Sequence, residues 1–226
     1  MSGILYGVGV GPGDPELLTL KAVRIMKESD IILVPGEEPR NSVAYKIATG
    51  VLDLSNKEVV AIEMPMTKDK QVLEKAHQEA AEQIMGYLKD NKQVAFLTLG
   101  DPCVYSTYIY VHKRILKAGG KASIISGITS FCAAAALIGD SLVEKAEPLH
   151  IIPASYAIEE AMNLKGTKVL MKAGKKLSLV KQKLKESDAQ AVMVENCGME
   201  DEKIYYGADE IEENAGYYSL IIVKDK

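Results

Sequence analysis

The segment LTLGDPCVYSTYIY, residues 97–110, joins the end of an apolar run to a sharp turn and a helical stretch. The apolar run 94–97 is followed by Gly100, a pattern typical of a buried strand. Gly100-Asp101-Pro102 ends this strand, because glycine accepts unusual backbone dihedrals and proline fixes φ and lacks an N–H. A helix is predicted to follow, up to Ala118. Such a corner lies where open α/β sheets bind ligands, at the carboxyl end of a strand.

This corner has two interpretations. In the first, Asp101 and the hydroxyls of Tyr105-Ser106-Thr107 belong to a ligand site. In the second, the corner only connects a strand to a helix, and Asp101 is a cap. The residues of the corner alone do not decide between them.

Strands and helices alternate on both sides of this segment. Asp14 followed by Pro15 predicts a helix start, and Ser42 is expected to cap a helix through residue 47. Thr67 is predicted to open a long helix that ends near Asn91. The alternation predicts a parallel sheet covered by helices on both faces. The predicted strands are 4–10, 31–34, 59–62, 94–97 and 122–125, and a last helix covers 131–138.

The pattern changes after Gly139. Strands become more frequent, and the last three follow one another closely, which predicts a mixed sheet and a second domain. The predicted fold class is therefore α/β with two domains, residues 1–126 and residues 127–226. The strands expected in the second domain are 150–152, 168–171, 191–195, 203–206 and 218–223, with helices at 157–164 and 177–186.

Composition and charge exclude several classes of function. A net charge of −4 argues against a broad nucleic-acid-binding surface. The three cysteines Cys103, Cys132 and Cys197 are widely separated, which predicts a reducing compartment and neither disulfides nor a zinc site. The histidines are equally scattered, so no metal site is predicted. The chain has no recognisable leader and its longest apolar run, 131–138, is too short to span a membrane, so we expect a cytoplasmic protein.

The glycines at positions 7, 9, 11 and 13 resemble a dinucleotide-binding fingerprint without matching one. The pattern G-x-G-x-x-G needs glycine where Pro12 or Asp14 stands. A Rossmann-type NAD site is therefore disfavoured.

Three stretches together resemble the tetrapyrrole methyltransferases, which use S-adenosylmethionine (SAM). They are GVGVGPGDP with LLT over residues 7–19, LGDP at 99–102 and GITS at 127–130. The resemblance extends over nearly the whole chain, because KVLM at 168–171 and VEN at 194–196 follow in the order expected for the family.

Within this family, the run GDPCVYST most resembles the members that methylate C-20 of precorrin-2 or cobalt-factor II in cobalamin synthesis. Relatives that act at other ring positions tend to have Phe-Gly or Tyr-Gly in place of Tyr-Ser-Thr. One departure is Ser126, which stands where relatives commonly have proline, and it bears on the rigidity of that turn.

The resemblance implies two α/β domains that hold SAM in the cleft between them, and a homodimer. For three of the implied SAM contacts a structural role is the alternative: a helix-start turn for Pro12, a core position for Met171 and a small buried thiol for Cys197. The SAM contacts carried over from the family are Pro12, Leu99, Gly100, Asp101, Val104, Thr129, Ser130, Met171 and Cys197.

The implied substrate is a large macrocycle that carries eight carboxylates. Arg40, one of few arginines, is a candidate for a bidentate carboxylate contact, the alternative being a solvated surface residue. Tyr105 and Ser106 are candidates for substrate contacts as well. No catalytic residue is assigned; the candidates are Tyr105 and Thr107, and helix capping is their alternative role.

Methyl transfer from a sulfonium needs no metal and no covalent enzyme intermediate, which agrees with the absence of a recognisable catalytic triad. Three functions are compared. The first is C-20 methylation of cobalt-factor II or precorrin-2; the modest chain length favours the cobalt-containing substrate. The second is another reaction of the family, such as methylation of uroporphyrinogen III or the synthesis of diphthine. The third is a SAM-binding module without activity.

Overall fold

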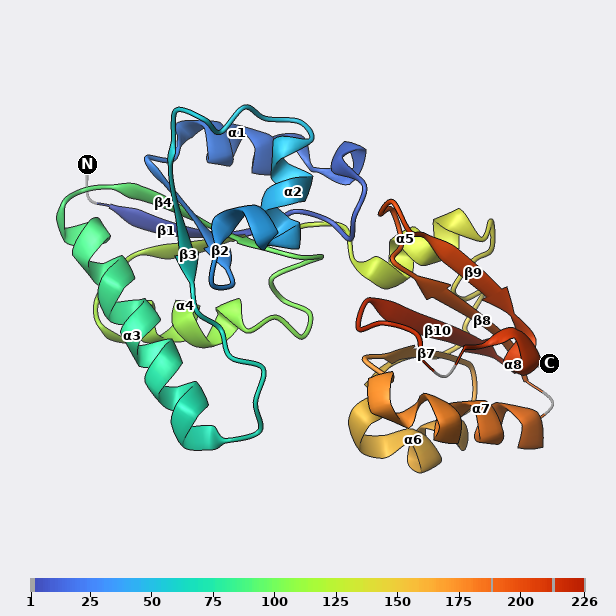
Figure 1. Ribbon diagram of the computed structural model, residues 1–226. Helices are drawn as coiled ribbons and strands as arrows, with labels where there is room; N and C mark the ends of the chain where they lie inside the picture. Colours follow the sequence, from blue (N-terminus) through green and yellow to red (C-terminus); the bar gives the residue numbers. More distant parts are fainter. Residues whose placement is uncertain (1–2, 188, 213, 226) are drawn as a thin grey trace. The chain divides into compact units, whose positions relative to one another are not determined.

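The strands of the N-terminal half pair in parallel, in the order β3-β2-β4-β1-β5, in the computed structural model of the protein (Figure 1). β2 and β4 are buried along most of their length, which agrees with continuous apolar runs in the sequence. The parallel sheet predicted from the alternation of strands and helices is confirmed. Its strands are β1 (Ile4–Gly9), β2 (Ile31–Pro35), β3 (Glu58–Ile62), β4 (Gln93–Thr98) and β5 (Ala122–Ile125).

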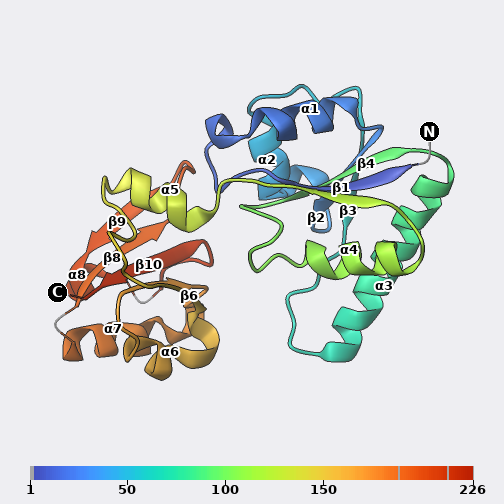
Figure 2. The ribbon, with the colours of Figure 1, turned by 180° about the vertical axis from the view of Figure 1, so that it is seen from behind.

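Helices cover both faces of this first sheet. Met26 of α1 packs with Val8 and Leu97 on one face, whereas Ile84 of α3 packs with Leu5 and Phe96 on the other. α2 lies beside α1, and α4 beside α3, as Figures 1 and 2 show. The helices are α1 (Leu20–Glu28), α2 (Val43–Thr49), α3 (Lys70–Lys89) and α4 (Tyr108–Lys117), with two short 3₁₀ turns, η1 (Pro15–Leu17) and η2 (Pro39–Asn41).

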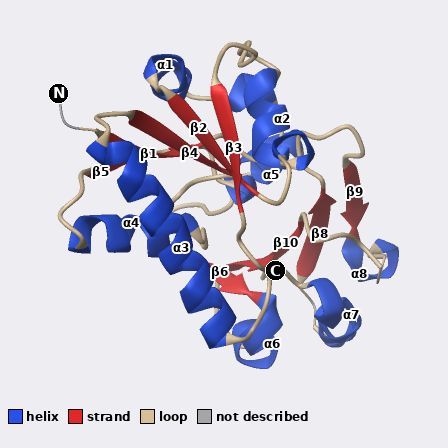
Figure 3. Cartoon of the chain, turned by 60° about the vertical axis from the view of Figure 1, so that its left-hand side comes forward, coloured by secondary structure: helices blue, strands red, loops and turns tan. Residues whose placement is uncertain are grey.

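The neighbouring strands β1 and β4 lead to opposite faces of the sheet. The chain leaves β1 towards α1 and leaves β4 towards α4. Figure 3 shows these strands as part of one twisted sheet. In open α/β sheets, the point where adjacent strands send their helices to opposite faces is the usual place for a ligand.

The second sheet is mixed, with the order β6-β7-β10-β8-β9, as the closely spaced strands predict. β6 and β7 are parallel, and β10 is antiparallel to both β7 and β8. The helices α6 and α7 pack against one face, while α5 contacts β10 on the other (Figure 2). The elements are α5 (Ser130–Leu137), β6 (Leu149–Pro153), α6 (Ala154–Met162), β7 (Thr167–Met171), η3 (Gly174–Lys176), α7 (Leu177–Glu186), β8 (Gln190–Glu195), β9 (Lys203–Tyr206), α8 (Gly207–Glu210) and β10 (Ser219–Lys224).

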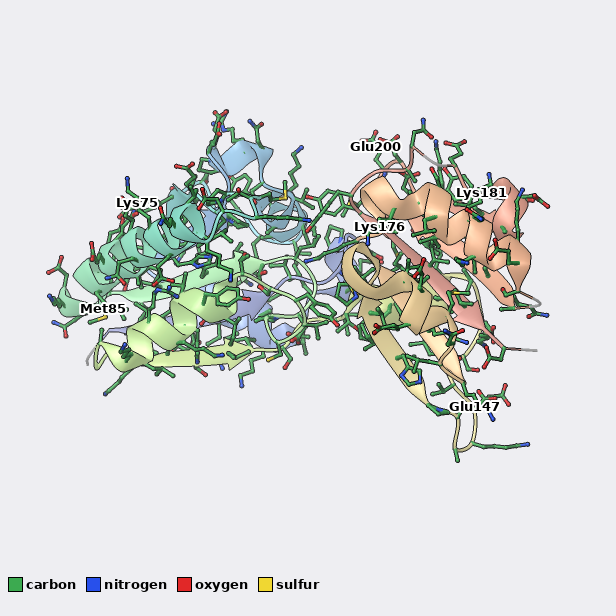
Figure 4. All side chains as sticks on the ribbon, turned by 90° about the horizontal axis from the view of Figure 1, so that it is seen from below. Lys75, Met85, Glu147, Lys176, Lys181 and Glu200 are labelled. Carbon is green, nitrogen blue, oxygen red and sulfur yellow. The ribbon has the colours of Figure 1, made fainter. Side chains whose placement is uncertain are left out.

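Two lysines form polar contacts that connect elements of the second unit. Lys181 of α7, labelled in Figure 4, donates to the carbonyl of Ile211 just after α8, at 2.8 Å. Lys168 of β7 is buried and pairs with Asp225, which also accepts the Gly166 N–H at 2.7 Å. Because removing Asp225 would leave the charge of the buried Lys168 uncompensated, this pair holds Asp225 against β7.

The structure describes residues 3–187, 189–212 and 214–225, and the chain divides into two compact units, residues 1–129 and residues 130–226. Among the described residues, no helix is both long and apolar enough to cross a membrane.

Three predicted helix starts are wrong. Asp14 caps only the short turn η1, and α1 begins at Leu20, where the Thr19 hydroxyl accepts the Ala22 N–H at 3.1 Å. Asp14 and Thr19 are both capping residues, and the prediction took the first of them as the start of the α-helix. Similarly, α3 is capped by Asp69 rather than by Thr67.

The third wrong start is that of α6, which begins at Ala154, directly after Pro153, and ends at Met162. Ser42 does precede α2 as predicted, but its hydroxyl makes no capping bond. The predicted end of α3 is confirmed, because Asn91 has a left-handed φ of 59° just beyond it.

Candidate functional site

Three loops of the first unit meet at the carboxyl ends of β1, β4 and β5. Gly9 ends β1, Gly100 follows β4 and Gly127 follows β5. A Cβ on Gly127 would lie 2.2 Å from the Gly100 carbonyl oxygen, and one on Gly9 would lie 2.6 Å from the same oxygen. The three backbones touch one another, so only glycine fits at Gly9 and Gly127.

Gly100 is fixed by backbone bonds and faces open space. It pairs with Gly11 through two hydrogen bonds, at 2.8 and 3.3 Å. Its φ of 69° lies in the left-handed region, which favours glycine. The nearest atom to a Cβ added there would be the Ile128 carbonyl oxygen, at 4.0 Å. The backbone at Gly100 is therefore held rigidly and still open to the approach of a ligand.

Asp101 connects two of these loops. Its Oδ1 accepts the Cys103 N–H at 2.7 Å, and its Oδ2 accepts the Gly127 N–H at 3.0 Å. The carboxylate is buried. Charged hydrogen bonds of this kind are among the stronger ones in proteins. Asp101 does not cap α4; its carboxylate joins the β4 and β5 loops, and its contact with a ligand stays a prediction.

Ser106 caps the helix that follows. Its Oγ lies 2.8 Å from Thr98 Oγ1 and accepts the Tyr108 N–H at 3.3 Å. Thr107 stands at the capping position itself, and its side chain makes no capping bond. The hydroxyl capping foreseen for this run therefore belongs to Ser106. Thr98 was missed in the sequence, although a polar residue at the end of an apolar strand was the available signal.

Tyr105 lies between these fixed residues in an unusual conformation. Its φ of 49° is left-handed, which is uncommon for a bulky residue. The residue is 46% exposed. Conformations of this kind concentrate at functional sites.

The ring of Tyr108 in α4 packs against β1 at Gly7. A Cβ on Gly7 would lie 2.0 Å from the Tyr108 ring, so Gly7 makes room for that ring. The Tyr108 hydroxyl hydrogen-bonds His112 Nδ1 at 2.9 Å, and burial raises the pKa of this phenol. Sequence reasoning missed Tyr108, whose signal was the glycine within β1.

The remaining predicted contacts of the first unit surround the same loops. Pro12 is buried, and Leu99 and Val104 are half-buried. Thr129 ends the unit, and its Oγ1 is buried without a hydrogen-bond partner in the described part of the chain. A buried hydroxyl without a partner carries a desolvation cost that a ligand can relieve.

Ser130, Met171 and Cys197 belong to the second unit. Ser130 begins α5, Met171 ends β7 and Cys197 is buried two residues after β8. Two residues before Cys197 in the sequence, Glu195 accepts the Gly216 N–H at 2.5 Å and the Tyr205 hydroxyl at 3.0 Å. The expected SAM contacts of Ser130, Met171 and Cys197 stay predictions.

Arg40 lies apart from the glycine loops. It is exposed, in the turn η2, and lines a depression of about 780 Å³ with Tyr45 and Lys57. The residues that line this depression come from positions 38–59, and none belongs to the loops after β1 or β4. Across residues 3–187, 189–212 and 214–225, no group of three or more histidine, cysteine or acidic residues is placed to hold a metal ion.

Comparisons with known proteins agree on one family. The family described as Tetrapyrrole (Corrin/Porphyrin) Methylases matches residues 4–211. A relative from Methanocaldococcus jannaschii, named probable cobalt-precorrin-2 C(20)-methyltransferase, is 38% identical over 97% of this chain and 95% of its own. A precorrin-2 C(20)-methyltransferase from a Sinorhizobium species is 30% identical over 99% of this chain and 97% of its own.

A solved structure supports the same fold. The uroporphyrin-III C-methyltransferase from Thermus thermophilus, complexed with S-adenosylhomocysteine, has a TM-score of 0.75 at 21% identity. The match covers 99% of this chain and 98% of that one. At this identity the likeness concerns the fold: two α/β domains, one with a parallel sheet and one with a mixed sheet.

Proposed function

Because the chain belongs to the family of tetrapyrrole (corrin/porphyrin) methylases, we propose that it transfers a methyl group from SAM to C-20 of a cobalamin precursor. The observation that carries the proposal is the full-length similarity to relatives named for that reaction. Of the two substrate forms, we favour the cobalt-containing one, cobalt-precorrin-2 or cobalt-factor II. One relative named for cobalt-precorrin-2 is 38% identical, while a second relative with that name and the relative named for precorrin-2 are each 30% identical.

The residues at the first sheet fit a ligand such as SAM. The backbone at Gly100 is held by Gly11 and has open space beside it, and the Thr129 hydroxyl has no partner among the described residues. We propose that SAM lies along Pro12, Leu99–Asp101, Val104 and Thr129. The contacts expected from Ser130, Met171 and Cys197 complete this proposal.

SAM, when bound, supplies a methyl group on a sulfonium and leaves as a neutral thioether. The chain's own task is to orient donor and acceptor and to exclude water. Orientation alone contributes about 7–11 kcal/mol in favourable cases. A loop whose backbone is fixed at Gly100 and Asp101 suits this task, because it needs no rearrangement when the reactants bind.

We propose Tyr105 and Arg40 as substrate contacts. Both side chains are exposed and leave the carboxyl edge of the first sheet, Tyr105 after β4 and Arg40 after β2. Thr107, also exposed, stays a candidate for proton transfer. We further propose that the enzyme is a homodimer in the cytoplasm, which the family resemblance and three free thiols support.

The test is anaerobic turnover of the purified protein with SAM and either cobalt-factor II or metal-free precorrin-2. Mass spectrometry should show one added methyl group, with faster turnover of the cobalt substrate. Titration calorimetry should show binding of SAM and of S-adenosylhomocysteine. Binding of SAM with no turnover of either compound would instead favour another ring position or a non-catalytic module.

A further inference from the structure

We propose that Glu195 is a positioning residue for the methyl donor: its carboxylate holds the turn 216–218 and, through this turn, the loop 196–202 that contains Cys197. The inference rests on the proposed function, because it takes SAM as the ligand of that loop. Glu195 itself is not assigned a contact with SAM. Its role in the second unit corresponds to that of Asp101 in the first, where one carboxylate also joins two loops.

Glu195 is a buried carboxylate at the end of β8, with 9% of the residue exposed. Its Oε1 accepts the Gly216 N–H at 2.5 Å, and its Oε2 accepts the Tyr205 hydroxyl at 3.0 Å. A Cβ on Gly216 would lie only 3.2 Å from Oε1. Both donors are neutral, and burial of a carboxylate costs free energy that an apolar side chain in the same space would not cost. We therefore assign the carboxylate to the placement of Gly216.

The turn 216–218 leads into β10 and is bonded to the loop after β8. The Gly216 carbonyl accepts the Ser219 hydroxyl at 2.8 Å, which closes the turn. The Tyr218 carbonyl accepts the Asn196 N–H at 2.9 Å. Glu195 is therefore connected to Asn196 both along the chain and through the hydrogen-bonded turn.

The loop 196–202 is ordered around Cys197 by its own hydrogen bonds. Asn196 Nδ2 donates to the Asp201 carbonyl at 3.3 Å, and the Gly198 N–H donates to Glu202 Oε2 at 2.6 Å. Cys197 lies between these two bonded residues and is buried. A displacement of Asn196 is therefore expected to displace Cys197.

Two of the expected SAM contacts of this unit lie at one edge of the second sheet. Met171 ends β7 and Glu195 ends β8, and the first residues of β10 pair with both strand ends. Because β10 lies between β7 and β8, the turn 216–218 enters the sheet between the strand end at Met171 and the strand end that precedes Cys197. The turn that Glu195 holds is thus placed to affect SAM binding.

Amide hydrogen exchange, followed by NMR in the intact protein, measures the placement of the loop without a substrate. We expect Glu195→Ala to speed exchange at Gly216 and Asn196 about tenfold, with no change at Ile222 within β10. Glu195→Gln should exchange as the wild type does, because its amide can accept the Gly216 N–H and donate to the Tyr205 hydroxyl. Unchanged exchange at Asn196 in Glu195→Ala would overturn the proposal.

Titration calorimetry with S-adenosylhomocysteine tests the consequence for binding. We expect Glu195→Ala to weaken binding about tenfold, and Glu195→Gln to change it less than about twofold. Tyr205→Phe keeps the bond to Gly216 and should also change the affinity less than about twofold. In turnover, the loss in Glu195→Ala should raise KM for SAM and leave KM for the tetrapyrrole unchanged. Full affinity in folded Glu195→Ala would contradict the proposal.

Asp225→Ala is the matched control for general destabilisation of the second unit. It removes the partner of the buried Lys168 at the opposite edge of the same sheet, where Lys168 pairs with Val223. Urea denaturation should show a loss of stability, while the affinity of the folded variant for S-adenosylhomocysteine should stay unchanged. A loss of affinity as large as in Glu195→Ala would assign the effect to destabilisation and overturn the proposal.

The proposed reaction and this inference can fail separately. A wild-type protein that binds S-adenosylhomocysteine and methylates no tetrapyrrole would refute the reaction, while the Glu195 variants would still decide the positioning. A wild-type protein that binds neither SAM nor S-adenosylhomocysteine would refute both.

Discussion

The loops after β4 and β2 leave the same edge of one sheet and differ in how they are held. In the β4 loop, Gly100 pairs with Gly11, Asp101 bonds Gly127, and Ser106 bonds Thr98. In the β2 loop, Arg40 is exposed, and the buried Ser42 hydroxyl has no partner in the described part of the chain.

From this difference we expect the two loops to have different roles in the proposed enzyme. Methyl transfer requires donor and acceptor to be aligned closely, so a rigid loop benefits the reacting centre. Carboxylates at the edge of a large macrocycle can be met by side chains that adapt. We therefore expect substitutions in the β4 loop, or at Gly127 of the β5 loop that touches it, to have larger effects than substitutions in the β2 loop.

The largest effect is expected for Gly127→Ala. The new Cβ would lie 2.2 Å from a backbone oxygen that cannot move aside independently, so we expect a loss of about 3 kcal/mol in the free energy of unfolding. SAM affinity should fall with it, because Gly100 and Thr129 would shift. Urea denaturation and titration calorimetry measure the two quantities.

Gly86→Ala is the matched control for this substitution. Gly86 lies within α3 with no atom within 4 Å of an added Cβ. Alanine should stabilise that helix by about 0.5–1 kcal/mol. If Gly127→Ala were as stable as Gly86→Ala, the tight contact of the three glycine loops would be disproved.

Asp101→Ala should have the next largest effect. It leaves the N–H groups of Cys103 and Gly127 without their charged acceptor, at a cost of about 2 kcal/mol of unfolding free energy. Asp101→Asn retains one acceptor oxygen and should lose about half as much. SAM binding should weaken in the same order. Full SAM affinity in folded Asp101→Ala would mean that the link between the loops does not shape the site.

Arg40→Ala should have the smallest effect. An exposed ion pair contributes about 1 kcal/mol at most, so we expect KM for the tetrapyrrole to rise about fivefold with unchanged SAM affinity. Arg40→Lys should recover part of this, because lysine keeps the charge and lacks the planar fork. Wild-type kinetics for Arg40→Ala would show that Arg40 of the β2 loop does not contribute to binding of the tetrapyrrole.

The elements that the sequence predicted well are those whose signal is local. β5 and α7 have the predicted bounds, because an apolar run or an apolar stripe defines each of them. Helix starts were less predictable where two capping residues stand close together. Asp14 and Thr19 both accept a backbone N–H, and only the second begins an α-helix.

The contacts that shape the candidate site were not predictable in the same way. Asp101 and Gly127 are 26 residues apart, and the pairing of their strands with β1 brings them together. The sequence motifs did identify both residues as notable. They did not indicate that Asp101 bonds Gly127, because that bond depends on the order of the strands in the sheet.

The most direct test of the account is the position of the transferred methyl group. The wild-type enzyme should be incubated anaerobically with cobalt-factor II and SAM that carries a carbon-13-labelled methyl group, and the product examined by carbon NMR. We expect the label on the C-20 bridge carbon, because we propose that the β4 loop, which contains Tyr105, aligns one ring carbon with the methyl group. A label on a pyrrole-ring carbon would contradict the assignment to C-20 while leaving family membership intact.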